Sequence, residues 1–247
     1  MMQYPKLSVV IITLNEQTRL PRLLSDLSRQ TWTDFEVIHV DSCSSDATIE
    51  TSRKWSAKFS RYRIVEMDRR GVSLGRNTGA AVARGERIVF LDADTRLAPD
   101  FFEETIQELD TKELDVGIIC MHGDDLPWAY RASFALFNIG IHLTSRVFPT
   151  AIGACLFSTP QMHRTVGGFD ETLSLCEDCH YTLRAFKHDR QRVGILRERF
   201  RFDPRRLEQD GLFATGFKYL HANARRMLIG ELHNQEIKYE FGHYARN

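Results

Sequence analysis

The chain has 247 residues, 43% of them hydrophobic, with 33 basic and 33 acidic side chains. This length and composition suit one large globular domain with a substantial buried core. Because the formal net charge is zero, no overall field attracts nucleic acid, and any positive site must be local. Nucleic acid is therefore excluded as the expected partner.

The cysteines and the hydrophobic runs indicate in which cellular compartment the protein is expected. Five cysteines make an odd number, and residues 1–16 lack the order of regions found in a signal peptide. The longest nearly apolar stretch, residues 132–143, is interrupted by polar side chains and is far shorter than the roughly 20 residues that span a bilayer. We expect a cytoplasmic protein without a transmembrane segment, with peripheral contact to the inner membrane face as a second possibility.

The first third of the chain alternates between strand and helix patterns. Residues 7–13 are a continuous β-branched apolar run, typical of a central parallel strand. Residues 19–29 carry leucines at the spacing of an amphipathic helix. A strand over 35–40, a capped helix over 47–59 and a short strand over 63–66 follow.

Residues 76–94 continue this alternation. The small residues after Arg76 predict a helix that lies close to a sheet, Gly85 is expected to end it, and residues 87–91 form an apolar strand. A helix over 100–109 and a strand over 116–120 follow. The pattern predicts an α/β fold, a Rossmann-like and mostly parallel sheet flanked by helices, with residues 1–120 as a nucleotide-binding half.

Residues 121–247 are expected to complete the same continuous domain with C-terminal helices. Residues 127–148 have a helical period but carry aromatic side chains around much of the circumference. We favour a helix buried between subdomains over one that lies in a membrane interface beside a lipid-linked substrate. The remaining expected elements are a strand over 154–158, a turn over 167–170, a helix from about Glu177, a strand over 194–197 and a helix over 211–232.

Polar side chains follow several predicted strands. Thr13, Asp41 and the pair Asp92 and Asp94 stand where strands end, and ligands bind at the carboxyl ends of parallel strands. Each acid could simply cap the next helix. That explanation fits Asp92 and Asp94 poorly, because two carboxylates one residue apart repel each other unless a cation lies beside them. A divalent cation that bridges a diphosphate is the better explanation.

Other phosphate chemistries fit less well. A phosphotransferase of the haloacid dehalogenase type has Asp-x-Asp-x-Thr after a strand, but here Thr95 comes one position early. Neither Gly-x-Gly-x-x-Gly nor a Gly-Lys-Ser/Thr loop is present, so side chains would have to hold the phosphates. Arg76 and the pair Arg205 and Arg206 are the candidates, although the pair could equally be a solvated basic patch.

Residues 176–180, Cys-Glu-Asp-Cys-His, formally match a haem attachment motif, and their Cys-x-x-Cys could also be a redox motif or half of a zinc site. Each possibility lacks its context, which is export for haem attachment, a small βαβ domain for a redox motif and a second cysteine pair for zinc. The two acids matter more. Glu177 and Asp178 at the start of a helix lie near a positive dipole end that keeps a carboxylate ionised, as a general base requires. A plain preference for acids at helix starts is an equally good local explanation.

Four ordered motifs, SVVIITLNE, VIHVDSCSSDAT, GRNTGAAVARGERIVFLDADT and GGFDETLSLCEDCHYTLR, together resemble the family 2 glycosyltransferases of GT-A fold. They are spread over about three quarters of the chain, from residue 8 to residue 184. The later piece FDPRRLEQDG is similar to the Arg-Arg segment of small, soluble bacterial members, although Leu207 replaces the usual aromatic residue.

The resemblance implies an inverting transfer from a nucleoside diphosphate sugar, a UDP or GDP sugar, with Mn²⁺ or Mg²⁺ as cofactor. Asp178 would deprotonate the acceptor hydroxyl and Glu177 would orient it. Asp94 would hold the cation together with Asp92, which also faces the ribose. The remaining donor contacts implied are Thr13, Asn15, Glu16 and Asp41 at the nucleoside, Asn77 and Ala93 beside it, and Arg76, Arg205 and Arg206 at the diphosphate.

Three alternatives stay open. Transfer to a polyprenyl phosphate needs no base, because the acceptor oxygen is already anionic, and a non-catalytic nucleotide-sugar-binding protein would have no need for Asp178. A third metal ligand could come from His221, His233 or His243, although solvated or core histidines explain them better. No separate carboxylate is available for a retaining route.

Overall fold

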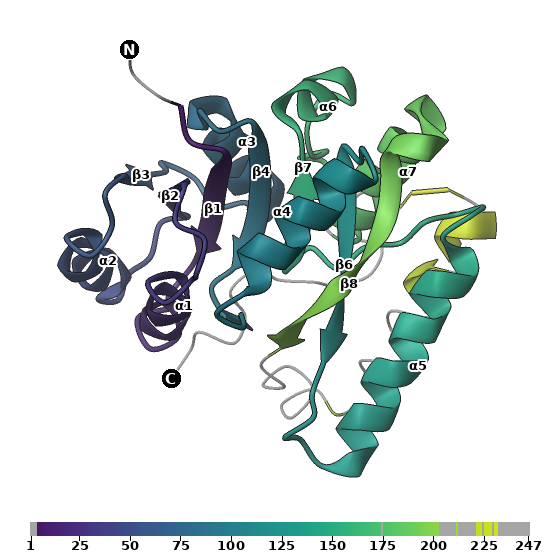
Figure 1. The fold of residues 1–247 in the computed structure, drawn as a ribbon, viewed down its shortest axis with the longest axis horizontal. Helices are drawn as coiled ribbons and strands as arrows, with labels where there is room; N and C mark the ends of the chain where they lie inside the picture. Colours follow the sequence, from purple (N-terminus) through teal and green to yellow (C-terminus); the bar gives the residue numbers. More distant parts are fainter. Residues whose placement is uncertain are drawn as a thin grey trace.

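The computed structural model describes residues 4–173, 175–202, 211, 221–223, 225–228 and 230–231. Within these residues, the strands are β1 (Leu7–Thr13), β2 (Phe35–Asp41), β3 (Tyr62–Glu66), β4 (Arg87–Asp92), β5 (Thr95–Arg96), β6 (Val116–His122), β7 (Cys155–Ser158) and β8 (Val193–Phe202). The helices are α1 (Leu20–Leu27), α2 (Thr48–Ser56), α3 (Val72–Val82), α4 (Phe101–Thr111), α5 (Trp128–Thr144), α6 (Pro160–Thr165), α7 (Glu177–His188) and a 3₁₀ helix (Arg190–Arg192). One sheet in the order β3-β2-β1-β4-β7-β6-β8-β5 joins all these strands, with helices on both faces (Figure 1).

The four strands β3, β2, β1 and β4 are parallel, and their ends are in register. Thr13 of β1 lies opposite Asp41 of β2, and Ile12 of β1 lies opposite Asp92 of β4. The expected strands over 7–13, 35–40, 63–66 and 87–91 are each confirmed to within one residue. The polar residues at these strand ends therefore share one edge of the sheet.

The second half of the sheet is mixed. β7 runs antiparallel to both β4 and β6, β8 is parallel to β6, and β5 pairs antiparallel with β8. The expected α/β fold with flanking helices is confirmed, whereas the pairing is less uniformly parallel than the alternating pattern indicated. Because β7 is reversed, its first residues lie at the edge where β4 and β6 end.

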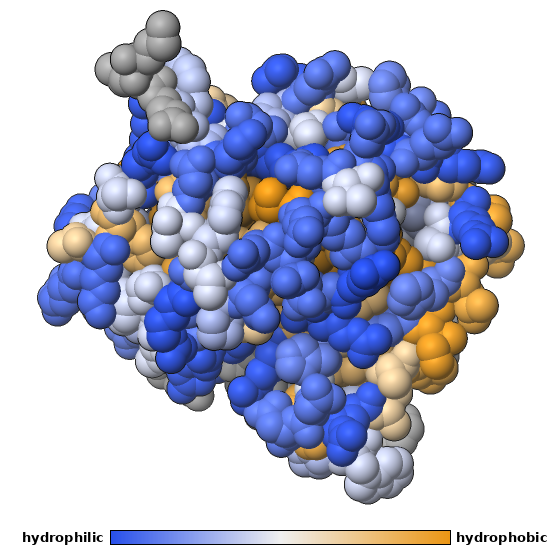
Figure 2. Space-filling view, viewed as in Figure 1, coloured by the Kyte–Doolittle hydropathy of each residue, from blue (hydrophilic) through white to orange (hydrophobic). Residues whose placement is uncertain are grey.

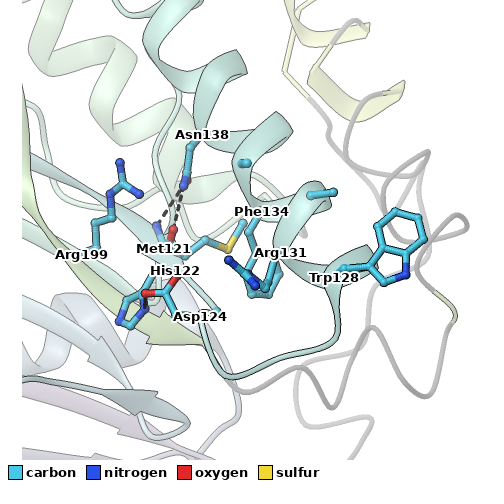
Figure 3. Close-up of a pocket in the computed structure, with 11 residues that line it drawn as sticks. Met121, His122, Asp124, Trp128, Arg131, Phe134, Asn138 and Arg199 are labelled. Atoms are coloured by element: carbon cyan, nitrogen blue, oxygen red, sulfur yellow. Dashed lines mark hydrogen bonds and ion pairs between the residues drawn. The ribbon is translucent and has the colours of Figure 1, made fainter.

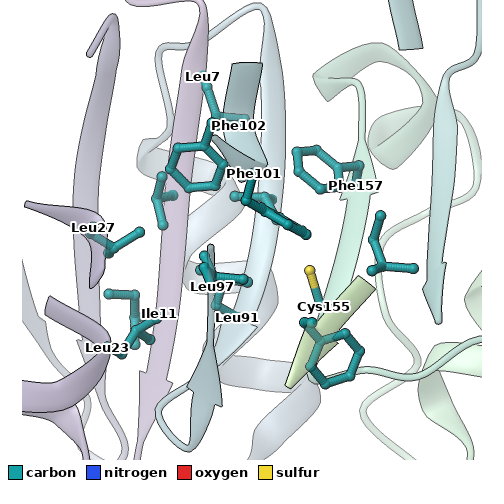
Figure 4. Close-up of a cluster of buried hydrophobic side chains, with 14 of the residues drawn as sticks. Leu7, Ile11, Leu23, Leu27, Leu91, Leu97, Phe101, Phe102, Cys155 and Phe157 are labelled. Carbon is teal, nitrogen blue, oxygen red and sulfur yellow. The ribbon is translucent and has the colours of Figure 1, made fainter. Parts of the chain in front are cut away.

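Two hydrophobic clusters cover the two faces of the sheet, because successive strand residues point to opposite faces. Val9 and Ile11 of β1 belong to the cluster under α1 and α4 (Figure 4). Val10 and Ile12 belong to the cluster under α3, α6 and α7. Each fully buried aliphatic side chain contributes roughly 1.5–3 kcal/mol to folding, so both layers hold the strand edge in place.

Helix α3 lies very close to the sheet at Gly79. A Cβ atom there would be 2.2 Å from Cγ1 of Val10, so only glycine permits this approach. The expected small-faced helix is thereby confirmed, but it ends at Val82 and not at Gly85. Gly85 instead passes the backbone of Ser8, where a Cβ atom would be 2.6 Å from the Ser8 nitrogen. This close packing brings Arg76, one turn before Gly79, to the sheet.

Helix α5 corrects our expectation of a helix buried between subdomains. It packs on β6 through one face, which includes Phe134, Asn138 and Ile141, while Leu136 and Leu143 on its other face are 70% and 77% exposed. Hydrophobic residues gather along the right margin in Figure 2, where α5 lies in Figure 1. No helix among the described residues has both the length and the apolar character needed to cross a bilayer.

The predicted helix over 211–232 lies largely outside the described residues. Gly211 is not helical, whereas residues 221–223 and 225–228 are.

Candidate active site

Arg76 joins two distant parts of the chain at the sheet edge. Its guanidinium is buried, with the residue 1% exposed. Nη1 donates to Oε1 of Glu177 at 2.7 Å, and Nη2 donates to Oδ1 of Asp92 at 3.1 Å and to the carbonyl of Gly153 at 3.1 Å. Burial lowers the pKa of Arg76, but the nearby carboxylates outweigh it and raise the pKa above its usual value. Arg76, which we expected near a diphosphate, holds two carboxylates in fixed positions.

An aromatic platform lies below this guanidinium. The Arg76 Cζ atom is 5.2 Å from the ring centre of Phe169, which stacks on Tyr181 at 4.4 Å. Asn77, the next residue of α3, holds the backbone of Phe169 from both sides, since its Nδ2 donates to the carbonyl at 2.9 Å and its Oδ1 accepts from the amide at 2.8 Å. Both polar atoms of the Asn77 side chain therefore bind the backbone of the expected turn over 167–170.

Asp178 lies beside Arg76 at the start of α7, which begins at Glu177 as expected. Its Oδ2 accepts from the amide of Gly153 at 2.5 Å, and its Oδ1 accepts from the amide of Cys179 at 2.7 Å. Burial and the negative charge of Glu177 raise the pKa of Asp178 to about 6, although Arg76 and the two amides oppose the shift. At neutral pH the group is mostly ionised and is more basic than an ordinary aspartate.

Gly153 is a site residue that the sequence pattern did not reveal. A Cβ atom there would be 2.7 Å from Nη2 of Arg76 and 3.0 Å from Oδ2 of Asp178. Its amide and carbonyl bind the same two side chains. The only local signal is a glycine just before a predicted strand, which indicates a close approach in general and not a particular partner.

Asp92, Ala93 and Asp94 follow β4 directly. The Asp92 side chain is 37% exposed while one of its oxygens binds Arg76, Ala93 is buried, and Asp94 is half-buried. The described part of the chain contains no group of three or more His, Cys, Asp or Glu side chains that could hold a metal. Two neighbouring carboxylates nevertheless fit Mg²⁺ or Mn²⁺, because such ions take one or two protein carboxylates and complete their shell with phosphate oxygens and water.

The ends of β1 and β2 are joined by buried hydrogen bonds. Thr13 Oγ1 donates to Asp41 Oδ1 at 3.0 Å and lies 2.8 Å from Nε2 of His39, and Asp41 Oδ2 accepts from the amide of Ser44 at 2.8 Å. Thr13 and Asp41 are each 1% exposed. Their side chains shape the floor of this part of the edge.

The loops after β1 and β2 are also joined. Asn15 Oδ1 accepts from the amide of Ser45 at 2.7 Å, and the amide of Glu16 donates to Thr48 Oγ1 at 2.8 Å. Asn15 adopts a left-handed φ of 57°. Of the other predicted residues, Arg205, Arg206, His233 and His243 lie outside the described residues, and His221 is exposed.

A pocket of about 350 Å³ opens where β6 ends and α5 begins (Figure 3). It lies at the same edge as Asp92, because β4 and β6 run in the same direction on either side of β7. The strands β4 and β6 are two strand spacings apart, a lateral distance of roughly 10 Å. Gly153 and Asp178 lie beside the start of β7, which is the strand between β4 and β6. The pocket is lined by Met121, His122, Gly123, Asp124, Trp128, Arg131, Ala132, Phe134, Ala135, Asn138 and Arg199.

Known proteins are similar to this chain in sequence and in fold. The family model for glycosyl transferase family 2 matches residues 8–166. Staphylococcus aureus TarS, a poly(ribitol-phosphate) beta-N-acetylglucosaminyltransferase, is 26% identical over 198 residues, which are 78% of this chain and 34% of TarS. The uncharacterized glycosyltransferase EpsJ of Bacillus subtilis is 26% identical over 205 residues, which are 78% of this chain and 59% of EpsJ. The chain thus spans less than two thirds of the length of each of these relatives.

Solved structures agree in fold. S. aureus TarS 1–349 in complex with UDP-GlcNAc has a TM-score of 0.63 at 23% identity, covering 79% of this chain and 58% of that one. The mannosyltransferase PcManGT from Pyrobaculum calidifontis, in complex with GDP-Man and Mn²⁺, has a TM-score of 0.64 at 21% identity, covering 78% of this chain and 57% of that one. The fold is GT-A, and the chain belongs to glycosyl transferase family 2.

Proposed function

We propose that this protein is an inverting glycosyltransferase that moves a sugar from a UDP or GDP sugar to an acceptor hydroxyl, with Asp178 as the general base. The observation that carries the proposal is the buried Arg76, which binds Asp92 at the end of β4 and Glu177 beside Asp178. Relatives of similar fold bind UDP-GlcNAc or GDP-Man with Mn²⁺, which supports this class of donor.

In this proposal residues 1–120 bind the donor and residues 121–247 bind the acceptor. Thr13 and Asp41 form the floor below the base, while Asn15 and Glu16 border the nucleoside. Asn77 and Ala93 support the donor site indirectly. Asn77 holds the turn at Phe169, and Ala93 is buried directly after β4. Arg205 and Arg206 are proposed to bind the leaving diphosphate, as the resemblance implies.

Asp92 and Asp94 are proposed to hold Mn²⁺ or Mg²⁺. The bound cation would stabilise the negative charge that develops on the leaving diphosphate. Arg76 contributes by fixing the Asp92 carboxylate through Oδ1, so that its other oxygen keeps a constant direction. The Asp92 carboxylate then does not have to reorient during the reaction.

Asp178 is proposed to take the proton of the attacking hydroxyl while the acceptor oxygen bonds to the anomeric carbon and the diphosphate leaves from the opposite face. The amides of Gly153 and Cys179 hold the carboxylate. Glu177, fixed by Arg76, orients the acceptor. One base on one face and one leaving group on the other give inversion without a carboxylate nucleophile.

A second acceptor class is favoured by one observation. Trp128 lines the pocket and begins α5, whose exposed face is apolar, so a lipid-linked acceptor such as a polyprenyl phosphate could extend from the pocket along that helix. Its anionic oxygen would need no base. The two acceptor classes therefore differ in their dependence on Asp178.

The test is a donor screen with the Asp178→Asn variant. The full chain is incubated with UDP and GDP sugars and Mn²⁺, and nucleoside diphosphate release and donor-induced thermal shift are measured with sugar and lipid phosphate acceptors. Asp178→Asn should lose at least about 100-fold in turnover and keep the donor-induced shift. Asp34→Asn, which alters a half-buried ion pair with Arg61 far from Asp178 in the sequence, is the matched control.

Each other outcome has a definite meaning. Near-normal turnover of Asp178→Asn would contradict the base assignment, and if it occurred with lipid phosphates only, the second acceptor class would be correct. Donor binding by the wild type without turnover of any acceptor or water would instead identify a non-catalytic nucleotide-sugar-binding protein.

A further inference from the structure

One side of the molecule carries an exposed apolar strip. We define the apolar strip as Leu136, Ile139 and Leu143 of α5, Val147 just after it, and Met227 and Leu228 near the C-terminus. Their exposures run from 53% to 81%. Figure 2 shows hydrophobic residues gathered along this margin. Such contiguous apolar surface marks a binding site more often than a solvated face.

Two segments far apart in the sequence build this strip. Arg226 is 3% exposed, and its Cζ atom is 5.2 Å from the ring centre of Phe148. Glu231 fixes the same guanidinium, accepting from Nε at 2.7 Å and from Nη2 at 3.0 Å. Met227 and Leu228, the next two residues, are thereby held beside the end of α5. The strip is continuous because the fold joins these segments.

The charge around the strip has one sign. Residues 126–169 contain no Asp or Glu. Arg131 on α5 and Arg146, two residues after its end, are exposed, and neither forms an ion pair with any residue that the structure describes. Of the described acids at its borders, Asp125 pairs with Arg201, Glu231 with Arg226, and Asp124 with the imidazole of His122. Although the net charge of the chain is zero, Arg131 and Arg146 thus lie beside the apolar strip without an ion-pair partner among the described residues.

This charge pattern favours an anionic lipid surface over a second copy of the chain as the binding partner of the strip. A twofold contact between two copies would place the same strip against itself, and Arg131 and Arg146 would then face cations with no acid to pair with. An anionic lipid surface complements both features, since it takes apolar side chains into the acyl boundary and attracts basic ones. The convex face of a single helix also suits a planar interface.

We propose that the apolar strip docks on an anionic membrane surface, with α5 lying in the plane of the interface and not crossing it. Trp128, 78% exposed at the start of α5, would then lie at the headgroup level, and the pocket that it lines would open beside the lipids. This inference does not depend on the proposed reaction, because it rests on surface residues outside the candidate active site.

Vesicle flotation tests the docking. The full chain should float with phosphatidylcholine vesicles that contain 30% phosphatidylglycerol, and float much less without the anionic lipid or at 0.5 M salt. Leu136→Glu with Leu143→Glu should abolish binding, and Arg131→Gln with Arg146→Gln should weaken it about tenfold or more. Tyr4→Glu is the matched control, because Tyr4 is 66% exposed and precedes β1, which β4 and β7 separate from β6.

Fluorescence provides a readout that does not depend on how well the glutamate variants fold. Trp32 and Trp55 pack against the core, so a blue shift and quenching by brominated lipids should come from Trp128 and disappear in Trp128→Phe. A wild type that neither floats nor shifts would overturn the proposal. Self-association in sedimentation equilibrium that the double glutamate variant abolishes, without lipid binding, would assign the strip to a second copy instead.

Discussion

Arg76 and Glu177 are 101 positions apart in the sequence, yet Nη1 of the arginine donates to Oε1 of the glutamate at 2.7 Å in a buried ion pair. The same guanidinium binds Asp92. The end of β4 and the start of α7 are thus held at a fixed separation. In the proposed reaction these are the donor side and the acceptor side, so the geometry of the transfer depends on one side chain.

Replacement of Arg76 by methionine should destabilise the protein and abolish turnover. Methionine leaves Glu177, Asp178 and Asp92 without their shared cation, and loss of one partner of a buried pair costs about 3–5 kcal/mol. Urea unfolding measures the loss. Arg53→Met is the control, because its pair with Glu66 is exposed at both partners and should contribute less than about 1 kcal/mol. Equal effects of the two variants would contradict the central role of Arg76.

Gly153→Ala should reduce kcat about 100-fold and leave the fold intact. The new Cβ would be 2.7 Å from Nη2 of Arg76 and 3.0 Å from Oδ2 of Asp178, so both groups must move, and a misplacement of about 1 Å is enough for such a loss. Gly140→Ala is the control, since its Cβ would have no heavy atom within 4 Å apart from its chain neighbours and the backbone of its own helix. As an alanine in a helix, it should add about 0.5–1 kcal/mol of stability. Full activity of Gly153→Ala would show that the contact is not needed.

The rate should depend on the ionisation of Asp178. Burial and the charge of Glu177 raise its pKa to about 6, and kcat/KM reports ionisation of the free enzyme. We expect kcat/KM to be constant above pH 7 and to fall tenfold per pH unit well below pH 6. Samples returned from pH 5 to pH 7.5 should recover full activity, which separates titration from unfolding. A profile that stays flat down to pH 5 would exclude Asp178 as the base.

Acid should weaken the fold through two buried histidines. Burial lowers the pKa of His39 and of His163 to about 4, so between pH 6.5 and 4 the unfolded chain binds more protons than the folded one. Each histidine therefore contributes stability that is fully present above pH 6.5 and falls by about 2 kcal/mol between pH 7 and pH 5. The raised pKa of Asp178 acts in the opposite direction between about pH 4 and 6.

Paired variants separate these contributions. His163→Phe keeps an aromatic ring among Phe90, Phe169 and Tyr181 and should shrink the stability difference between pH 7 and pH 5 by about 2 kcal/mol. Urea unfolding at both pH values measures it. His188→Phe changes an exposed histidine and should leave the difference as in the wild type. An unchanged difference in His163→Phe would show that His163 does not carry this dependence.

Several elements could be predicted from the sequence because their signals are local. The run Leu7–Thr13 is mostly apolar and β-branched, and β1 has the same limits. The acids Glu177 and Asp178 indicated a helix start, and α7 begins there. Gly79 indicated a close approach to a sheet. In each case a few neighbouring residues carry the information, because periodicity and capping act within one or two turns.

Only the tertiary structure decided how these pieces meet. β5 has two residues and exists because β8 pairs with it. The exposed face of α5 could not be told from a buried one, since its aromatic and aliphatic residues lie on both sides. Gly153 became a site residue only when the reversed strand β7 brought it beside Asp178, and the carboxylate partners of Arg76 appeared only when α3, β4 and α7 came together. Local sequence determines which conformations a segment favours, whereas burial and charge pairing depend on partners that lie a hundred residues away.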